Sequence, residues 1–215
     1  MYAYFVVVSL LSAYVFALPS FHKNVWKEPV PPVPIDLFVM SKCPDAVYCE
    51  AVFSSVLKKV SVPVTLDINY IAQYDGSDPF EHSCKHGVSE CFGNIQQLCF
   101  KYEYPDREDW FAFDLCLNKR YKQIGLNNNL ALHCAKEGKK SYDRVDKCSR
   151  SSLGIGLLTE SAQKTKALGV RSSCTVFIDQ KLRCIHDGSW KNCPGGWKIE
   201  DFIRTIEDAY HAKYN

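Results

Sequence analysis

Residues 35–44 read IDLFVMSKCP and contain the clearest structural pattern in the chain. The first six residues, Ile35–Met40, form a short apolar run with β-branched and aromatic members, which predicts a buried strand. A two-residue turn and Cys43 follow, and then Pro44, a residue favoured at the first position of a helix. The stretch therefore predicts a strand that leads directly into a helix N-terminus, with Cys43 at the junction.

The sequence on the C-terminal side of this junction continues the same pattern. Residues 46–60 have apolar side chains at helical spacing, and residues 62–70 alternate as in a strand, so that a βαβ unit begins here. Farther along we expect a helix over 159–168, a strand over 175–179 with a hairpin partner at 182–185, and an amphipathic helix over 199–210. Two such halves predict an α/β domain with a small mixed sheet.

Residues 71–160, between the two halves, have a different character. They hold six cysteines, many aromatic residues and short helical patterns such as residues 110–123. We interpret this segment as a disulfide-bearing helical insertion.

Charge and cysteine content limit the class of protein. The 215 residues include 26 Lys and Arg against 24 Asp and Glu. The resulting net charge of +2 gives no strong electrostatic attraction to nucleic acid or to an anionic membrane. The 11 cysteines favour an oxidising compartment, because a reducing cytosol would leave most of them as thiols. Since 11 is odd, at least one thiol lies outside any internal disulfide.

The N-terminal residues predict export. Residues 1–17, MYAYFVVVSLLSAYVFA, are nearly all apolar but too short to span a membrane, which favours a signal peptide over an uncleaved anchor or a buried helix. Residues 18–34 are rich in proline and predict an extended leader, followed by one domain over 35–212. We therefore expect a protein that is secreted, or lumenal in a vacuole or lysosome, with no membrane segment after signal cleavage.

A signature lies within the insertion. Residues 84–99 read CKHGVSECFGNIQQLC and fit the pattern C-x-H-G-x2-E-C-x2-N-x4-C. The chain thereby resembles the gamma-interferon-inducible lysosomal thiol reductase (GILT) family over residues 35–183. The resemblance implies a thioredoxin-like fold with a disulfide-rich helical insertion. It also implies a thiol oxidoreductase that reduces protein disulfides in a secretory, lysosomal or vacuolar compartment.

Cys43 is the predicted attacking group. Disulfide reduction needs a thiolate, and a cysteine at a helix N-terminus lies near the positive end of the helix dipole, which favours the charged form. Lys42 adds a positive charge nearby, whereas Asp45 opposes it. The alternative is that Cys43 is one half of a structural disulfide.

The spacing to the next cysteine departs from the family. Relatives have two residues between the active-site cysteines, but five separate Cys43 from Cys49. Six helical steps place the Cα atoms about 9 Å apart along the axis, whereas a disulfide needs Cα atoms within roughly 7 Å. Cys49 can therefore bond to Cys43 only if the first helical turn is unwound.

Cys174 is a second candidate partner. Thioredoxin-like proteins usually have a cis-proline just before the strand that faces the active-site turn, and this chain has Cys174 there. We expect Cys174 to lie close to Cys43 and hypothesise that it is the redox partner. Two alternatives stay open: a structural bridge from Cys174 to Cys43 or Cys49, and a soft metal bound by all three sulfurs.

The other cysteines are predicted to be structural. Cys184 and Cys193 flank a turn-rich segment and are expected to close a local loop, and disulfides are expected within the insertion at Cys84, Cys91, Cys99, Cys116, Cys134 and Cys148. Four residues could be considered as zinc ligands, but their spacing matches no known zinc-finger pattern: His82, Cys84, His86 and Cys91.

The sequence thus predicts an enzyme without a cofactor. Its expected partners are disulfide-containing proteins and a small-thiol or protein reductant. The competing hypothesis is a non-catalytic, disulfide-stabilised secreted protein of the same fold.

Overall fold

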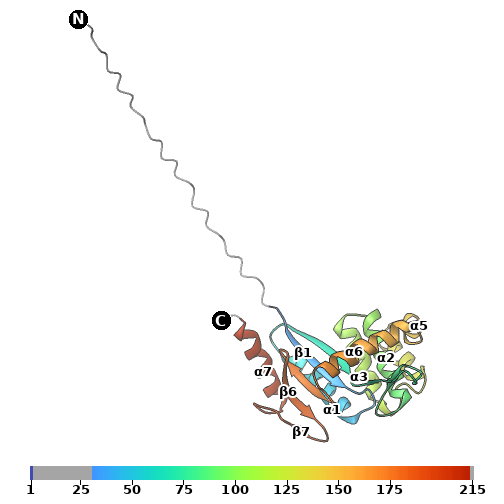
Figure 1. Ribbon diagram of the computed structural model, residues 1–215. Helices are drawn as coiled ribbons and strands as arrows, with labels where there is room; N and C mark the ends of the chain where they lie inside the picture. Colours follow the sequence, from blue (N-terminus) through green and yellow to red (C-terminus); the bar gives the residue numbers. More distant parts are fainter. Residues whose placement is uncertain (2–30, 214–215) are drawn as a thin grey trace.

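The computed structural model describes Met1 and residues 31–213 of the chain (Figure 1). The predicted signal peptide, apart from Met1, and residues 18–30 of the predicted leader lie outside the described residues.

A five-stranded mixed sheet is the centre of the described part of the chain. Its strand order is β2-β1-β5-β6-β7, with β1 and β2 parallel and the other neighbours antiparallel. The strands are β1 (Val33–Val39), β2 (Val64–Tyr70), β5 (Thr175–Ile178), β6 (Lys181–His186) and β7 (Trp190–Lys191). A separate two-stranded sheet pairs β3 (Gln73–Tyr74) with β4 (His82–Ser83). The predicted strands and the predicted hairpin are therefore present.

Strand β1 begins earlier than the apolar run suggested. It starts at Val33 and contains Pro34, two residues that the sequence placed in the extended leader. The fixed φ of proline is compatible with extended backbone, and near the start of a strand its missing N–H removes little of the ladder. Val33, Ile35, Leu37 and Val39 alternate toward the core and are at most 1% exposed, which fixes the register of this central strand.

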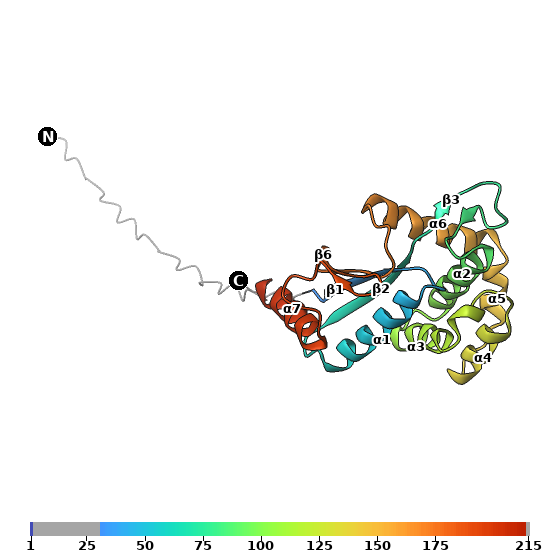
Figure 2. The same ribbon diagram turned by 90° about the horizontal axis from the view of Figure 1, so that it is seen from below.

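Helices cover both faces of the sheet (Figure 2). Helix α1 (Pro44–Lys59) and helix α7 (Ile199–Ala212) lie together on one side, where the rings of Phe53 and Phe202 are 5.1 Å apart and fully buried. Helix α6 (Ser152–Ala167) packs on β2, and its Ser161 hydroxyl accepts the backbone N–H of Tyr70 at 2.7 Å.

Helix α6 is about two turns longer at its N-terminus than the predicted helix over 159–168. Gly154 and Gly156 lower the helix propensity of these turns, which is why the sequence alone did not predict them. Gly154 is buried, and a Cβ there would lie 2.6 Å from the carbonyl oxygen of Cys148. Close packing against the preceding helix thus outweighs local propensity.

The helical insertion forms a cluster at one end of the sheet (Figures 1 and 2). It comprises α2 (Val88–Glu103), α3 (Arg107–Asn118), α4 (Asn129–Glu137) and α5 (Asp143–Ser149), with a 3-10 turn at Tyr121–Gln123. The predicted helix over 110–123 therefore divides into α3 and this turn. Disulfides join α2 to α5, join α3 to α4, and close the start of α2, through the pairs Cys99–Cys148, Cys116–Cys134 and Cys84–Cys91.

The remaining local bridge also forms as predicted, between Cys184 and Cys193. None of the helices in the described residues is both long enough and apolar enough to cross a membrane.

Candidate functional site

Cys43 occupies the junction that the sequence predicted. It is the N-cap residue of α1, with extended backbone at φ −86° and ψ 129°, and Pro44 begins the helix. The Cys43 N–H donates to the carbonyl of Met40 at 2.9 Å, which closes the turn after β1. All 11 cysteines lie in the described part of the chain, and Cys43 alone is outside a disulfide. The residue is 7% exposed.

The first two turns of α2 hold the turn before Cys43. The Ser41 N–H donates to Asn94 Oδ1 and the Lys42 N–H donates to Glu90 Oε2, each at 3.2 Å. Glu90 and Asn94 are fully buried members of the signature, and His86 bonds Glu90 Oε2 through Nδ1 at 2.5 Å. The signature thus supplies the acceptors for the backbone that presents Cys43, a role that sequence reasoning missed although the pattern itself marked the residues.

The charge of Lys42 is directed toward the insertion. Its Nζ donates to Ser89 Oγ at 2.8 Å. Burial lowers the pKa of Lys42, and the nearby Glu90 carboxylate offsets part of that effect. The charged group that hydrogen-bonds the Cys43 sulfur is instead Asp45.

Cys49 and Cys174 are bonded to each other. Their Cα atoms are 6.3 Å apart, and the bridge joins residues 125 positions apart in sequence. Both residues are 0% exposed. Helix α1 is continuous from Pro44, so Cys49 does not approach Cys43 by unwinding the first turn. Of the pairings that the sequence left open, the structure contains the one between Cys49 and Cys174.

The loop before β5 brings Ser173, the residue next to Cys174, beside Cys43. Ser173 accepts the Met40 N–H through its hydroxyl at 3.0 Å, and its carbonyl oxygen lies 4.0 Å from Cys43 Sγ. The peptide bond between Ser173 and Cys174 is cis. The first turns of α1 therefore carry a free thiol at the N-cap, Cys43, and a disulfide from Cys49 to Cys174.

A carboxylate contacts the Cys43 thiol and an imidazole contacts that carboxylate, and sequence reasoning did not find them as a pair. The Cys43 thiol donates to Asp45 Oδ2 at 3.7 Å, while Asp45 Oδ1 lies 2.7 Å from His186 Nδ1 and accepts the Gly188 N–H at 2.8 Å. His186 ends β6, and 141 positions separate it from Asp45. No local pattern signals a contact between residues so far apart.

Two buried carboxyl groups lie in the interface between α1 and α3. Burial raises the pKa of Glu50 to about 7, although a hydrogen bond from Asn118 Nδ2 at 2.6 Å acts in the opposite direction. Burial and the neighbouring Glu50 raise the pKa of Asp114 well above its usual value. Glu50 directly follows Cys49 in α1, so a carboxyl group with a raised pKa adjoins the disulfide-bearing residue.

The alternative of a three-sulfur metal site does not match this arrangement, because Cys49 and Cys174 are joined to each other rather than present as thiolates. Within the described residues no cluster of three or more Cys, His, Asp or Glu side chains is arranged to hold a metal ion.

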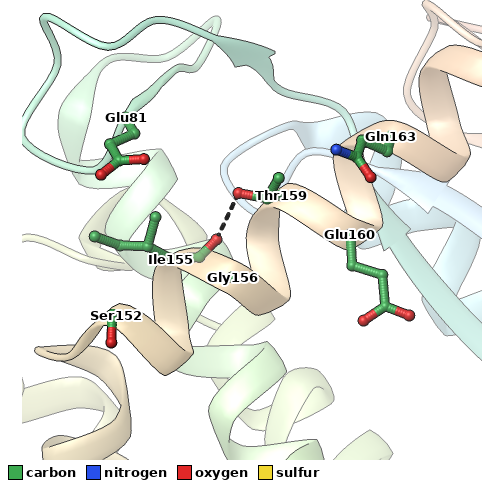
Figure 3. A pocket seen from close by; sticks show the side chains of 7 residues that line it. All are labelled: Glu81, Ser152, Ile155, Gly156, Thr159, Glu160 and Gln163. Atoms are coloured by element: carbon green, nitrogen blue, oxygen red, sulfur yellow. Dashed lines mark hydrogen bonds between the residues drawn. The ribbon is translucent and has the colours of Figure 1, made fainter.

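A separate shallow hollow of about 340 Å³ lies between α6 and the loop that joins β3 to β4 (Figure 3). No cysteine lines it, so it is distinct from the thiol site. Its lining residues are Glu81, Ser152, Ile155, Gly156, Thr159, Glu160 and Gln163.

Solved structures with the same arrangement of elements are disulfide-handling proteins. A putative protein disulfide isomerase from Nitrosomonas europaea matches with a TM-score of 0.61 at 9% identity, covering 86% of this chain and 100% of that one. Oxidised BdbD from Bacillus subtilis matches with a TM-score of 0.59 at 13% identity, covering 84% of this chain and 88% of that one. A thioredoxin-like oxidoreductase from Silicibacter pomeroyi matches with a TM-score of 0.54 at 13% identity, covering 85% of this chain and 89% of that one. At such low identity these likenesses show the fold alone, and they confirm the predicted thioredoxin-like fold.

Sequence comparisons find similarity to the same family that the signature indicated. The sequence model of the gamma interferon inducible lysosomal thiol reductase family matches residues 34–138 of this chain. A GILT-like protein of Caenorhabditis elegans is 30% identical over 156 residues, which are 66% of this chain and 45% of that protein. This chain therefore spans about half the length of the curated relative that it matches. The signature, the fold and these matches agree, and over residues 34–138 the chain is similar to the gamma interferon inducible lysosomal thiol reductase family.

Proposed function

We propose that this protein is a thiol-disulfide oxidoreductase that reduces disulfides of protein substrates, with Cys43 as the attacking thiol. One observation carries the proposal: the cysteine that stays outside any disulfide is the N-cap of α1, and the same helix carries Cys49, which is joined to Cys174 in a buried disulfide. The similarity to the thiol reductase family over residues 34–138 supports the same chemistry.

The position of Cys43 suits a nucleophile. A helix N-terminus stabilises negative charge through its unpaired N–H groups and the helix dipole, typically by about 0.3–1 kcal/mol at an exposed site. The thiolate is the species that attacks a disulfide sulfur. Attack on a substrate R–S–S–R′ joins Cys43 to R–S and releases R′–S⁻ as the leaving group.

Cys174 and Cys49 together supply the two electrons that the reduction needs. In the reduced protein, the Cys174 thiolate attacks Cys43 Sγ in the mixed disulfide, which forms a Cys43–Cys174 bond and releases R–S⁻. Cys49 then attacks Cys174, which forms the Cys49–Cys174 bond and frees Cys43. The substrate has gained two electrons, and the protein ends with one thiol and one disulfide, the arrangement present in the structure.

Burial restricts how a reductant can reset the site. Both bridged residues are 0% exposed, whereas Cys43 is 7% exposed. Cys43 therefore attacks Cys174 in the reverse direction, and an external thiol then reduces the resulting Cys43–Cys174 bond. Two electrons enter from a small thiol or a protein dithiol, which is oxidised to its disulfide.

We further propose that the protein acts in a secretory, lysosomal or vacuolar lumen, or after secretion. Five disulfides within the described residues suit an oxidising compartment. The predicted signal peptide over residues 1–17 supplies the route.

The test is reduction of insulin with dithiothreitol as electron donor, at pH 5 and pH 7. We expect Cys43→Ser to fall to the uncatalysed rate. The double variant Cys49→Ala/Cys174→Ala is expected to form a mixed disulfide with the substrate in a single turnover but to lose most of its steady-state rate. Cys184→Ala/Cys193→Ala, which removes one disulfide outside the site, is the matched control and should keep its activity. If the wild-type protein and Cys43→Ser are equally inert, the non-catalytic alternative replaces this proposal.

A further inference from the structure

We propose that Asp45 accepts the proton of the Cys43 thiol and returns it to the leaving sulfur, and that His186 positions Asp45 for this transfer. The inference rests on the proposed function of Cys43, and it concerns two residues other than the three cysteines.

The two carboxylate oxygens of Asp45 have separate contacts. Oδ1 accepts the Gly188 N–H at 2.8 Å and lies 2.7 Å from His186 Nδ1, so two groups fix its position. Oδ2 faces the Cys43 sulfur at 3.7 Å. One oxygen thereby anchors the carboxylate, while the other remains directed at the reacting atom.

His186 is itself held firmly. Its backbone pairs with Cys174 in both directions, at 2.9 and 2.8 Å. Its ring stacks on Tyr48 at 4.5 Å between centroids and meets the edge of Trp190 at 4.9 Å, and the residue is 9% exposed. The imidazole therefore has little freedom to swing away from Asp45, which makes it a positioning residue.

Proton transfer within this pair avoids placing two negative charges side by side. A thiolate next to an ionised carboxylate is disfavoured because like charges at this separation repel. When the proton moves from Sγ to Oδ2, the pair carries one negative charge before and after the transfer. As Sγ bonds to the substrate sulfur, the proton on Oδ2 passes to R′–S⁻, and Asp45 becomes a carboxylate again. No co-reactant is consumed.

Other charged groups surround His186 and are common to every variant below. Asp187 follows it in the chain and pairs with Lys191 Nζ at 2.8 Å, and Lys85 acts on Asp187 from the segment before α2. From α1 the ring faces Asp45 and Tyr48. A change in pH dependence confined to the Asp45 and His186 variants therefore reports on that pair.

The test measures how steeply the rate of Cys43 modification by iodoacetamide changes between pH 5 and pH 7, read by mass spectrometry. With an internal proton acceptor, the wild-type rate should change only a few-fold. In Asp45→Asn the solvent must take the proton, so the rate should change about tenfold per pH unit, as for a single titrating thiol below its pKa. An Asp45→Asn profile as shallow as that of the wild type, or shallower, would overturn the proton-transfer role.

Two further variants separate positioning from folding. His186→Phe keeps a ring between Tyr48 and Trp190 but removes the Nδ1 contact, and its profile should lie between those of the wild type and Asp45→Asn. A wild-type profile in His186→Phe removes the positioning role of His186. Glu108→Gln, which changes an exposed first-turn carboxylate of α3, is the control and should match the wild type.

The iodoacetamide reaction involves no disulfide substrate, so it keeps the two proposals distinguishable. A steep Asp45→Asn profile in a protein that fails to reduce insulin would contradict the proposed function and leave the proton transfer standing. If the protein reduces insulin but Asp45→Asn and His186→Phe keep the wild-type pH profile of modification, the proposed function stands and the proton-transfer proposal is contradicted.

Discussion

His186 and Cys174 are direct backbone partners, since each donates its N–H to the carbonyl of the other. From these adjacent positions two links reach α1: the disulfide from Cys174 to Cys49 and the hydrogen bond from His186 to Asp45. The N-terminal end of α1 is thereby fixed to the sheet at two points, one covalent and one polar. The position of Cys43 relative to the loop before β5 follows from these links.

The arrangement of disulfides predicts one free thiol per chain. Under non-reducing conditions in guanidinium chloride, alkylation should add a single label, and peptide mapping should place it on Cys43. In the native protein, labelling should be slower, because Cys43 is 7% exposed. Three labels, with Cys49 and Cys174 among them, would show that this bridge is open in the isolated protein.

Loss of the Cys49–Cys174 bridge should cost more stability than loss of the Cys184–Cys193 bridge. The two bridges join residues 125 and 9 positions apart, and a longer closed loop removes more entropy from the unfolded chain. In the chain-entropy description the double alanine variants lose about 4–5 and about 2–3 kcal/mol respectively. Urea unfolding at pH 5 measures both; an equal loss would contradict the loop-length argument.

The buried Glu50 predicts that stability falls as the pH rises. Its pKa is about 7 in the folded protein against 4.5 in the unfolded chain, so the folded state retains a proton that the unfolded state loses. The contribution is fully present below pH 4.5, decreases as the pH rises through this interval, and levels off above about pH 7. The shift corresponds to a loss of about 3 kcal/mol in the free energy of unfolding.

Glu50→Gln tests this dependence. The variant keeps the shape of the side chain and an oxygen for the Asn118 contact but cannot ionise. Its free energy of unfolding, from urea titrations at pH 4.5 and 7.5, should decline less than that of the wild type. Glu108→Gln, at an exposed position, should leave the wild-type slope unchanged. An unaltered slope in Glu50→Gln would rule out Glu50 as its source.

Gly125 is predicted to be intolerant of any side chain. Its φ is +68°, and a Cβ there would lie 1.8 Å from the Ser89 carbonyl oxygen and 2.7 Å from the Gly93 N. Gly125→Ala should therefore push against the first two turns of α2, which hold the Cys43 turn, and lose more than about 3 kcal/mol. Gly169 has nearly the same φ, +67°, with no atom within 4 Å of a Cβ.

Gly169→Ala is accordingly the matched control, because it carries the backbone strain without the contact. It should lose only about 1 kcal/mol, measured by the same urea titration. Equal losses in the two variants would mean that backbone conformation, rather than close packing, explains the cost at Gly125.

Local sequence was enough to predict the framework of the molecule. The apolar run before Cys43, the proline after it and the alternation in the following strand are short-range patterns, and each element formed within a few residues of its predicted place. The length of α6 was underestimated, because close packing of Gly154 outweighs its low helix propensity.

The sequence by itself determined that Cys43 stands between a strand and a helix, that an odd thiol must remain, and that helical spacing separates Cys43 from Cys49. These follow from the covalent order of residues and the rise of a helix. Three features became known from the folded chain: Cys49 pairs with Cys174, Glu90 and Asn94 hold the turn, and His186 contacts Asp45. Those contacts join segments far apart in the chain, and they exist only once the packing of strands and helices has brought the segments together.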